Sequence, residues 1–270
     1  FRFVRETAHQ CAEAGLQVWL YDEDPYPSGN AGGWITIEHP ELRALAMQRY
    51  SPPAHLKQGE NWAFPSGKLC WAGLVPTSGS GQVIDLTSRV GILRQEWRVL
   101  DPWDSRWYYP ATPRFPCPRS ETYVPEFAMR LPAIPAGMQL QAFVAQPSGV
   151  DSIWGALPDT LNPTATKLFI ERTHERYRRE LGDLFGGPIT AIFSDEAKYF
   201  GNRPWTPALF DGFLQTYGYD LRARLYHLFE SHHTPEAMRA RLDYRHWLLA
   251  RFEDAWLKPV GDWCRRNNLK

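Results

Sequence analysis

The chain has 270 residues, and 43% of them are apolar, which is enough for a folded core and argues against disorder. Its 30 Lys and Arg residues balance its 30 Asp and Glu residues, so no net charge favours nucleic acid or an anionic membrane as a partner. No segment approaches the roughly 18 consecutive apolar residues of a membrane-spanning helix. We therefore expect neither nucleic acid nor a membrane as a partner.

The start of the chain and its cysteines leave the compartment open. The chain begins at Phe1 without an initiator Met, so we expect a piece of a longer protein, and the lack of a signal peptide is uninformative. The 12 Trp, 12 Tyr and 14 Phe residues suit either stacking on sugar rings or filling of the core. Four cysteines are far apart and predict buried apolar thiols rather than disulfides or metal ligands: Cys11, Cys70, Cys117 and Cys264.

Residues 1–50 are expected to form the first βα part of a barrel. Apolar residues at helical spacing predict a helix over 4–15 that ends at Gly15. A strand over 17–22 follows within two residues and ends in acids. Pro40 and further apolar spacing predict a second helix over 40–50.

Residues 51–150 predict a β-rich insertion, because Pro and Gly cluster there and helical periodicity fades. Strand-like runs lie at 83–87, 92–100 and 138–145, and the last alternates as a half-buried strand would. The insertion carries five of the twelve Trp residues: Trp62, Trp71, Trp97, Trp103 and Trp107.

Residues 151–270 predict further βα units of the same barrel. We expect strands over 152–157 and 189–194, with a helix between them that Asn162 caps. Later helices are predicted to begin at Thr206, Asp220 and Thr234, and Pro259 is expected to kink the last one. Seven of its residues are predicted to face inward: Met238, Leu242, Leu249, Phe252, Trp256, Val260 and Trp263.

The predicted fold is α/β: a partial (β/α)₈ TIM-type barrel with a β-rich insertion, truncated at both ends. An open doubly wound sheet is the alternative, but Gly79-Ser80-Gly81 lacks the third glycine of a phosphate-binding fingerprint. Because half a barrel leaves strand edges open, we expect the chain to fold poorly alone.

The cluster Asp22-Glu23-Asp24 ends the first strand and is the first candidate site. Asp22 and Asp24 should point one way and Glu23 the other, so the three cannot all serve one site. A merely solvated acidic loop is the alternative, although the Pro- and Gly-rich residues 25–33 shape the loop strongly. The cluster predicts binding of sugar hydroxyls or of a cation, with Ca²⁺ the best match for such dense oxygen ligands.

The pair Asp195-Glu196 ends the second acid-tipped strand and is the candidate catalytic site. Barrel enzymes keep catalytic acids at the carboxyl ends of strands, and an apolar setting would raise the pKa of Glu196, which suits a general acid. A helix cap or surface pair is the alternative reading. Two acid-tipped strands indicate carboxylate chemistry, and glycoside hydrolysis is the commonest such chemistry. His174 is expected to be a packed or exposed helix residue rather than a ligand.

Several motifs together resemble the signature of the α-L-rhamnosidases of glycoside hydrolase family 106 and their uncharacterised relatives. They are Val18-Trp19-Leu20-Tyr21-Asp22-Glu23-Asp24 with Pro27-Ser28-Gly29 and Ala31-Gly32-Gly33, Leu161-Asn162-Pro163, Thr173-His174-Glu175-x-Tyr177, Phe193-Ser194-Asp195-Glu196, Pro204-Trp205-Thr206, and Phe213-x-x-x-Tyr217-Gly218-Tyr219-Asp220-Leu221. The resemblance implies a (β/α)₈ domain of a large bacterial protein, periplasmic or secreted, that hydrolyses glycosidic bonds of plant or microbial polysaccharide with inversion and often with Ca²⁺.

Carried onto this chain, the resemblance implies that Asp22, Glu23, Asp24 and Glu196 line the sugar or metal site, with Asp22 and Asp24 as candidate metal ligands. Glu196 is the expected proton donor, Asp195 its catalytic neighbour, and a second carboxylate activates water. Four aromatic residues are expected to stack on sugar: Tyr26, Trp34, Tyr199 and Trp205. Two other readings stay open, a carbohydrate-binding barrel without turnover and a different barrel enzyme such as a lyase.

Overall fold

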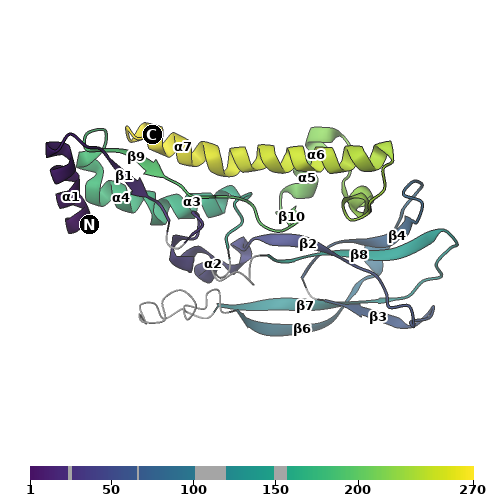
Figure 1. The fold of residues 1–270 in the computed structure, drawn as a ribbon. Coiled ribbons are helices and arrows are strands. Elements are labelled where there is room, and N and C mark those ends of the chain that lie inside the picture. The colour runs from purple at the N-terminus through teal and green to yellow at the C-terminus, as the bar shows by residue number, and fades with distance from the viewer. Residues whose placement is uncertain (24–25, 66, 101–119, 149–156) are drawn as a thin grey trace.

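The computed structural model describes residues 1–23, 26–65, 67–100, 120–148 and 157–270. Figure 1 shows a long helical rod along one side of the molecule, a small parallel sheet beside one end of it, and two layers of antiparallel strands beside the other end. The chain is therefore a mixed α/β protein.

The parallel part is built on β1 (Val18–Tyr21) and β9 (Ile189–Phe193), which pair directly although 167 residues separate the end of β1 from the start of β9. The helix α1 (Arg2–Glu13) precedes β1, and Gly15 follows it with φ of +73°, so the predictions for residues 4–22 are confirmed. On the other edge of β9, Lys270 N donates to Thr190 O at 3.0 Å and accepts from Ile192 N through its own carbonyl at 3.1 Å. One face of this sheet packs with the surrounding helices into a hydrophobic core. The buried residues of this core are Ala8, Leu20, Leu181, Leu184, Ile189, Trp263, Cys264 and Leu269.

The segment between the two strands leads back to β9 through consecutive helices. Asn162 caps α3 (Pro163–Arg172) by accepting from Thr164 N, as expected. The predicted single helix is divided at Thr173 into α3 and α4 (His174–Leu181), followed by the turn η4 (Gly182–Leu184). The predicted strand over 152–157 lies almost wholly outside the described residues.

The rod consists of α6 (Pro235–Phe252), one π-helical turn η6 (Glu253–Leu257) and α7 (Lys258–Arg266). Pro259 lies in the first turn of α7, directly after the π-helical turn, because proline cannot supply the N–H of a regular helical bond. Three residues predicted to face inward, Met238, Leu242 and Leu249, are exposed, which corrects that part of the prediction. Phe252, Trp256 and Trp263 are buried as expected.

Shorter helices connect the rod to the antiparallel sheets. The helix α5 (Leu209–Tyr217) ends at Gly218 in the left-handed conformation, and η5 (Arg222–Leu228) follows. Thr206 does not cap α5 as predicted, because its hydroxyl donates to Asp159 instead. Short helical segments of three to five residues also occur among the described residues: η1 (Ala31–Gly33), α2 (Trp34–Glu38), η2 (Pro40–Leu42) and η3 (Thr87–Arg89).

The antiparallel strands form two sheets packed face to face, as Figure 1 shows. The five-stranded sheet has the order β10 (Pro204–Trp205), β2 (Leu45–Tyr50), β8 (Met138–Pro147), β4 (Lys68–Pro76) and β5 (Ile84–Asp85). The three-stranded sheet has the order β3 (Asn61–Phe64), β7 (Ser120–Arg130) and β6 (Gly91–Leu100). The β-rich character predicted for this region is confirmed.

The strand β8 separates two cores. Leu140 and Val144 pack into the core between the two sheets, whereas Phe143 packs into the core shared with α3, α5 and α6. Both faces of β8 are therefore buried, which corrects the prediction of a half-buried strand. A polar residue at every second position predicts one exposed face, but the structure buries Gln141 on that face together with Phe143.

The helix predicted over 40–50 is wrong. Only residues 40–42 form a helical turn, and residues 45–50 form β2, which pairs with β8 along its whole length and with β10 at Leu45 and Ala46. Pairing with strands about 100 and 160 residues later overrides the local spacing, which a sequence pattern cannot anticipate. Because β2 and β10 belong to the sheet of the insertion, strands from both flanks complete it.

No closed barrel is present among the described residues, and the division of the chain into three parts stays a prediction. Cys70 and Cys264 are buried free thiols and Cys11 is partly buried, while Cys117 lies outside the described residues. Within the described ranges, the helices are too short or too polar to cross a membrane.

Candidate functional site

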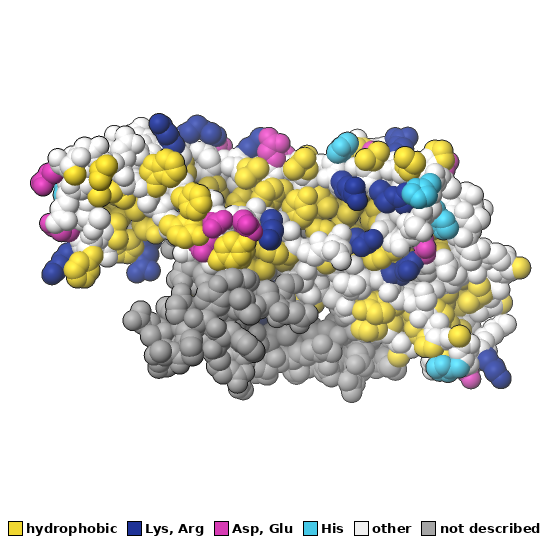
Figure 2. All heavy atoms as spheres, in the orientation of Figure 1, with side chains coloured by type: hydrophobic (Ala, Val, Ile, Leu, Met, Phe, Trp, Pro, Cys, Tyr) yellow, Lys and Arg dark blue, Asp and Glu magenta, His cyan; other side chains and the backbone are white. Residues whose placement is uncertain are grey.

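The two acid-tipped strands lie side by side. β1 and β9 are parallel, with Tyr21 opposite Phe193, and Asp22 N donates to Phe193 O at 3.2 Å. Because parallel strands end at the same edge of a sheet, Glu23 follows β1 directly beside Asp195 and Glu196, which follow β9. In Figure 2, acidic side chains gather beside exposed hydrophobic ones on the part of this face that borders the grey atoms.

Tyr21 joins the two strand ends. Its hydroxyl lies 2.6 Å from Glu23 Oε2 and 2.9 Å from Asp195 Oδ2, and hydrogen bonding to Glu23 is the largest cause that raises the pKa of Tyr21 well above its usual range. The Tyr21 carbonyl in turn accepts from the hydroxyl of Tyr177 on α4 at 2.7 Å. The single proton of this phenol is thus shared between two carboxylates, one at the end of each strand.

Glu196 is exposed and held by two groups. The hydroxyl of Tyr26 donates to its Oε2, Lys198 Nζ lies 3.6 Å from the same oxygen, and its backbone has φ of +44°. The hydrogen bond from Tyr26, followed by the charge of Lys198, lowers the pKa of Glu196, while that hydrogen bond raises the pKa of Tyr26 to about 12. The expectation of an apolar setting that raises the pKa of Glu196 is therefore wrong: Glu196 reaches solvent and is ionised at neutral pH.

Asp22 lies below the surface, with only 1% of its area exposed. Its Oδ1 accepts from Ser28 Oγ at 2.6 Å, and Ser194 also forms a hydrogen bond with the carboxyl group. Burial nevertheless raises the pKa of Asp22 to about 6. The alternation predicted for Asp22 and Glu23 is confirmed, since Asp22 points inward and Glu23 is partly exposed.

His174 faces Asp22 from α4. Its Nε2 lies 3.6 Å from Asp22 Oδ2, and both side chains are inaccessible to solvent. Among the described residues, neither ring nitrogen of His174 nor Asp22 Oδ2 has a hydrogen-bond partner. Burial lowers the pKa of His174 to about 4, so the imidazole is neutral, and Phe169 and Trp263 pack edge-on against it. Of the two alternatives expected for this helix residue, packed or exposed, the structure shows the packed one.

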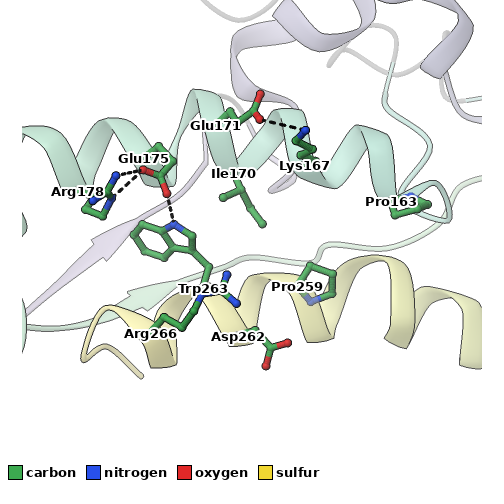
Figure 3. A pocket seen from close by; sticks show the side chains of 10 residues that line it. All are labelled: Pro163, Lys167, Ile170, Glu171, Glu175, Arg178, Pro259, Asp262, Trp263 and Arg266. Carbon is green, nitrogen blue, oxygen red and sulfur yellow. Dashed lines mark hydrogen bonds and ion pairs between the residues drawn. The ribbon is translucent and has the colours of Figure 1, made fainter.

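A groove behind this pair lies between α3, α4 and α7 (Figure 3). There Glu175 accepts from Trp263 Nε1 at 2.7 Å and pairs with Arg178 at 2.7 Å, so it ties α4 to α7 and supports the packing around His174. Lys167 pairs with Glu171 in the same groove at 3.8 Å. These four charges are paired within the groove, which Asp262 and Arg266 also line.

Three of the aromatic residues predicted to stack on sugar, Trp34, Tyr199 and Trp205, lie in other parts of the fold. Tyr199 packs edge-on against Phe252, and Trp205 lies in β10 with Lys68 Nζ 5.3 Å from its ring centre. Trp34 begins α2. No contact joins these three aromatic residues to the carboxylates in the described part of the chain, so their role in sugar binding stays a prediction.

The described residues do not complete a calcium site. In the described ranges, no three His, Cys, Asp or Glu side chains converge as metal ligands, and Asp24 lies outside those ranges. Asp22 Oδ2 has no hydrogen-bond partner there, but it is buried beside His174 rather than facing further oxygen ligands. Binding of Ca²⁺ stays a prediction, and no chemical step is assigned to it.

A second groove adjoins the carboxylates. It has a volume of about 480 Å³ and lies between the end of β9 and α7. Glu196 and Ser194 line it together with the apolar side chains of Ile192, Trp256, Val260 and Leu269. A largely apolar lining with a few polar groups, here Glu196 and Ser194, is typical of small-molecule sites.

Comparisons with known proteins identify one related fold. No protein-family model matches the chain, and no curated protein matches it. The chain is similar to the solved structure of a rhamnosidase from Novosphingobium sp. PP1Y, with 14% sequence identity and a TM-score of 0.51. The match covers 98% of this chain and 40% of the rhamnosidase chain. The likeness concerns the fold, so this chain has a fold like that of part of a glycoside hydrolase.

Three residues important to the site were missed by sequence reasoning. The sequence places Tyr21 at the end of a predicted strand, Ser28 in a predicted turn and His174 in a predicted helix, without indicating their contacts. Tyr21 gave a usable signal, since it directly precedes three carboxylates at a strand end. Ser28 and His174 give none, because the contact of Ser28 with Asp195 spans 167 positions of the sequence and that of His174 with Asp22 spans 152.

Proposed function

We propose that this chain is part of a glycoside hydrolase that inverts the anomeric centre of its substrate, a plant or microbial polysaccharide containing α-L-rhamnosides. The observation that carries the proposal is the meeting of Glu23, Asp195 and Glu196 at the ends of two parallel strands. The fold similarity to a rhamnosidase supports it, as does the resemblance of the strand-end motifs to family 106.

In the proposed reaction, Glu196 is the base, which replaces the role of proton donor that the resemblance implies for it. Its lowered pKa keeps it ionised at neutral pH, which suits removal of a proton from water better than donation of one. The water oxygen forms the new bond to the anomeric carbon as the glycosidic carbon–oxygen bond breaks. The leaving oxygen takes a proton from the carboxyl group of Asp195, the donor we assign because it lies beside Glu196 at the same strand end.

Exposed aromatic side chains beside the carboxylates would bind the sugar. Trp19, Tyr21 and Phe193 are 64%, 41% and 47% exposed. Tyr21 and Phe193 are paired across β1 and β9, and Trp19 lies two residues before Tyr21 on β1. Tyr21 and Phe193 contact each other with ring centres 5.3 Å apart. Flat aromatic faces next to carboxylates match the alternating C–H and hydroxyl surfaces of a sugar ring.

Hydrolysis of a panel of aryl glycosides, α-L-rhamnoside included, tests the proposal in the intact protein. We expect release from one glycoside, a loss of at least about 100-fold in kcat in Glu196→Gln, and no loss in Asp211→Asn, which changes an exposed carboxylate on α5. Repeating the assay with a chelator tests the calcium prediction separately.

A carbohydrate-binding protein without turnover is the alternative. The hydrogen bond from Tyr26 and the ion pair with Lys198 both engage Glu196 internally, which favours a structural role for it. Binding of the same sugars by wild type and Glu196→Gln, with no hydrolysis by either, would support that alternative and reject the enzyme.

A further inference from the structure

We infer that Ser28 is a positioning residue that fixes the loop carrying Asp195 and Glu196, an inference that rests on the proposed function. Ser28 is buried between the two strand-end loops. Its backbone N–H donates to Asp195 O at 3.0 Å, and its Oγ accepts from Asp195 N at 2.8 Å. One residue of the first loop thus satisfies both backbone groups of Asp195.

Asp22 sets the direction of the Ser28 hydroxyl. A hydroxyl has a single proton, and Ser28 donates it to Asp22 Oδ1 at 2.6 Å in a buried environment. The oxygen lone pairs are then left for the N–H of Asp195. The buried carboxylate therefore acts on the exposed acids through Ser28, across a chain of two short hydrogen bonds.

The residue after Ser28 holds the loop from the other side. Gly29 has φ of +115°, and a Cβ there would lie 2.8 Å from the ring of Trp256. Trp256 stacks on Phe169 with ring centres 4.9 Å apart, and Phe169 packs against His174. Ser28 therefore lies between a rigid aromatic stack and Asp195, with little freedom to move.

The consequence concerns the direction of Glu196. This residue follows Asp195 directly, has φ of +44° without being glycine, and makes its side-chain contacts at the surface. Exposed contacts alone hold a side chain weakly. The backbone of Asp195, held by Ser28, is what keeps the next residue in place.

Amide hydrogen exchange in the intact protein tests the inference without requiring activity. In Ser28→Ala the Asp195 amide loses its acceptor, so its exchange should quicken by about tenfold while amides in α6 keep their rates. Ser28→Thr retains a hydroxyl and should restore slow exchange. Tyr50→Phe removes a hydroxyl that donates to Gln146 between β2 and β8, and it should leave Asp195 unchanged.

Kinetics on the reactive aryl glycoside give the second readout. We expect Ser28→Ala to lower kcat by about tenfold with KM changed less than about twofold, because the carboxylates of Asp195 and Glu196 are misdirected while the sugar still binds. Unchanged exchange at Asp195 in Ser28→Ala would overturn the inference, as would equal loss of kcat in Tyr50→Phe. Absence of turnover in the wild type would count against the proposed function alone, since the exchange result stands independently.

Discussion

Replacing Asp159 by Asn should stabilise the protein at neutral pH. Asp159 is a buried residue of the loop before α3, where it accepts from Thr206 Oγ1 at 2.7 Å and from Leu161 N at 3.1 Å. Burial raises its pKa from 3.8 to about 6, and these hydrogen bonds only partly offset that effect. An Asn side chain has nearly the same shape, can accept from Leu161 N, and can donate to the Thr206 hydroxyl.

The magnitude follows from linkage between protonation and folding. Because the pKa is raised in the folded state, that state binds the proton more tightly than the unfolded chain, and the free energy of unfolding falls as pH rises from about 4 to about 6. A shift of about two units corresponds to about 3 kcal/mol, at 1.36 kcal/mol per unit. The loss of stability that Asp159 causes is absent below about pH 4 and complete above about pH 6.

Urea unfolding of wild type and Asp159→Asn between pH 4 and pH 7.5 measures this difference. The advantage of the variant should grow by about 3 kcal/mol over that range. His174 and His227, whose pKa values burial lowers to about 4, occur in both proteins, so their opposite pH dependence cancels in the comparison. Parallel pH curves for the two proteins would refute the reasoning, and Asp211→Asn provides the control for an exposed carboxylate.

Two further substitutions test the surroundings of the carboxylates. Gly29→Ala should lower the free energy of unfolding by about 2 kcal/mol or more, because the backbone of Gly29 has a positive φ and the new Cβ would collide with Trp256. Gly137→Ala, where φ is +79° but the space is open, should lower it by about half as much in the same urea titration. Equal losses would contradict the close packing. Tyr26→Phe removes the largest cause of the lowered pKa of Glu196, so that pKa should rise in a carbon-detected NMR titration, whereas an unchanged value would contradict the assigned hydrogen bond.

Local pattern was sufficient for the elements that surround the parallel strands. The helix before β1, the two acid-tipped strands and the cap at Asn162 were predictable, because periodicity, glycine and capping residues act within a few positions. β2 was not predictable, because its conformation depends on pairing with β8. The inward side of α6 was also misjudged, since Met238 and Leu242 fit a helical stripe that the fold leaves uncovered.

The site was predictable in position but not in chemistry. Acids at the ends of two parallel strands must lie near each other, which is why Glu23, Asp195 and Glu196 could be grouped from sequence. The protonation of Glu196 could not be predicted, because it depends on Tyr26 and Lys198 and on exposure rather than on the preceding apolar strand.

The configuration of the product formed by Glu196→Ala in the presence of azide tests the central claim most directly. If Glu196 is the base of an inverting glycoside hydrolase, the variant should hydrolyse an aryl α-L-rhamnoside very slowly, and azide, which needs no base, should restore release of the aryl group. Proton NMR should then show a glycosyl azide of inverted anomeric configuration. A glycosyl azide of retained configuration would contradict the account. So would a wild type as inactive as Glu196→Ala, together with no release of the aryl group when azide is added.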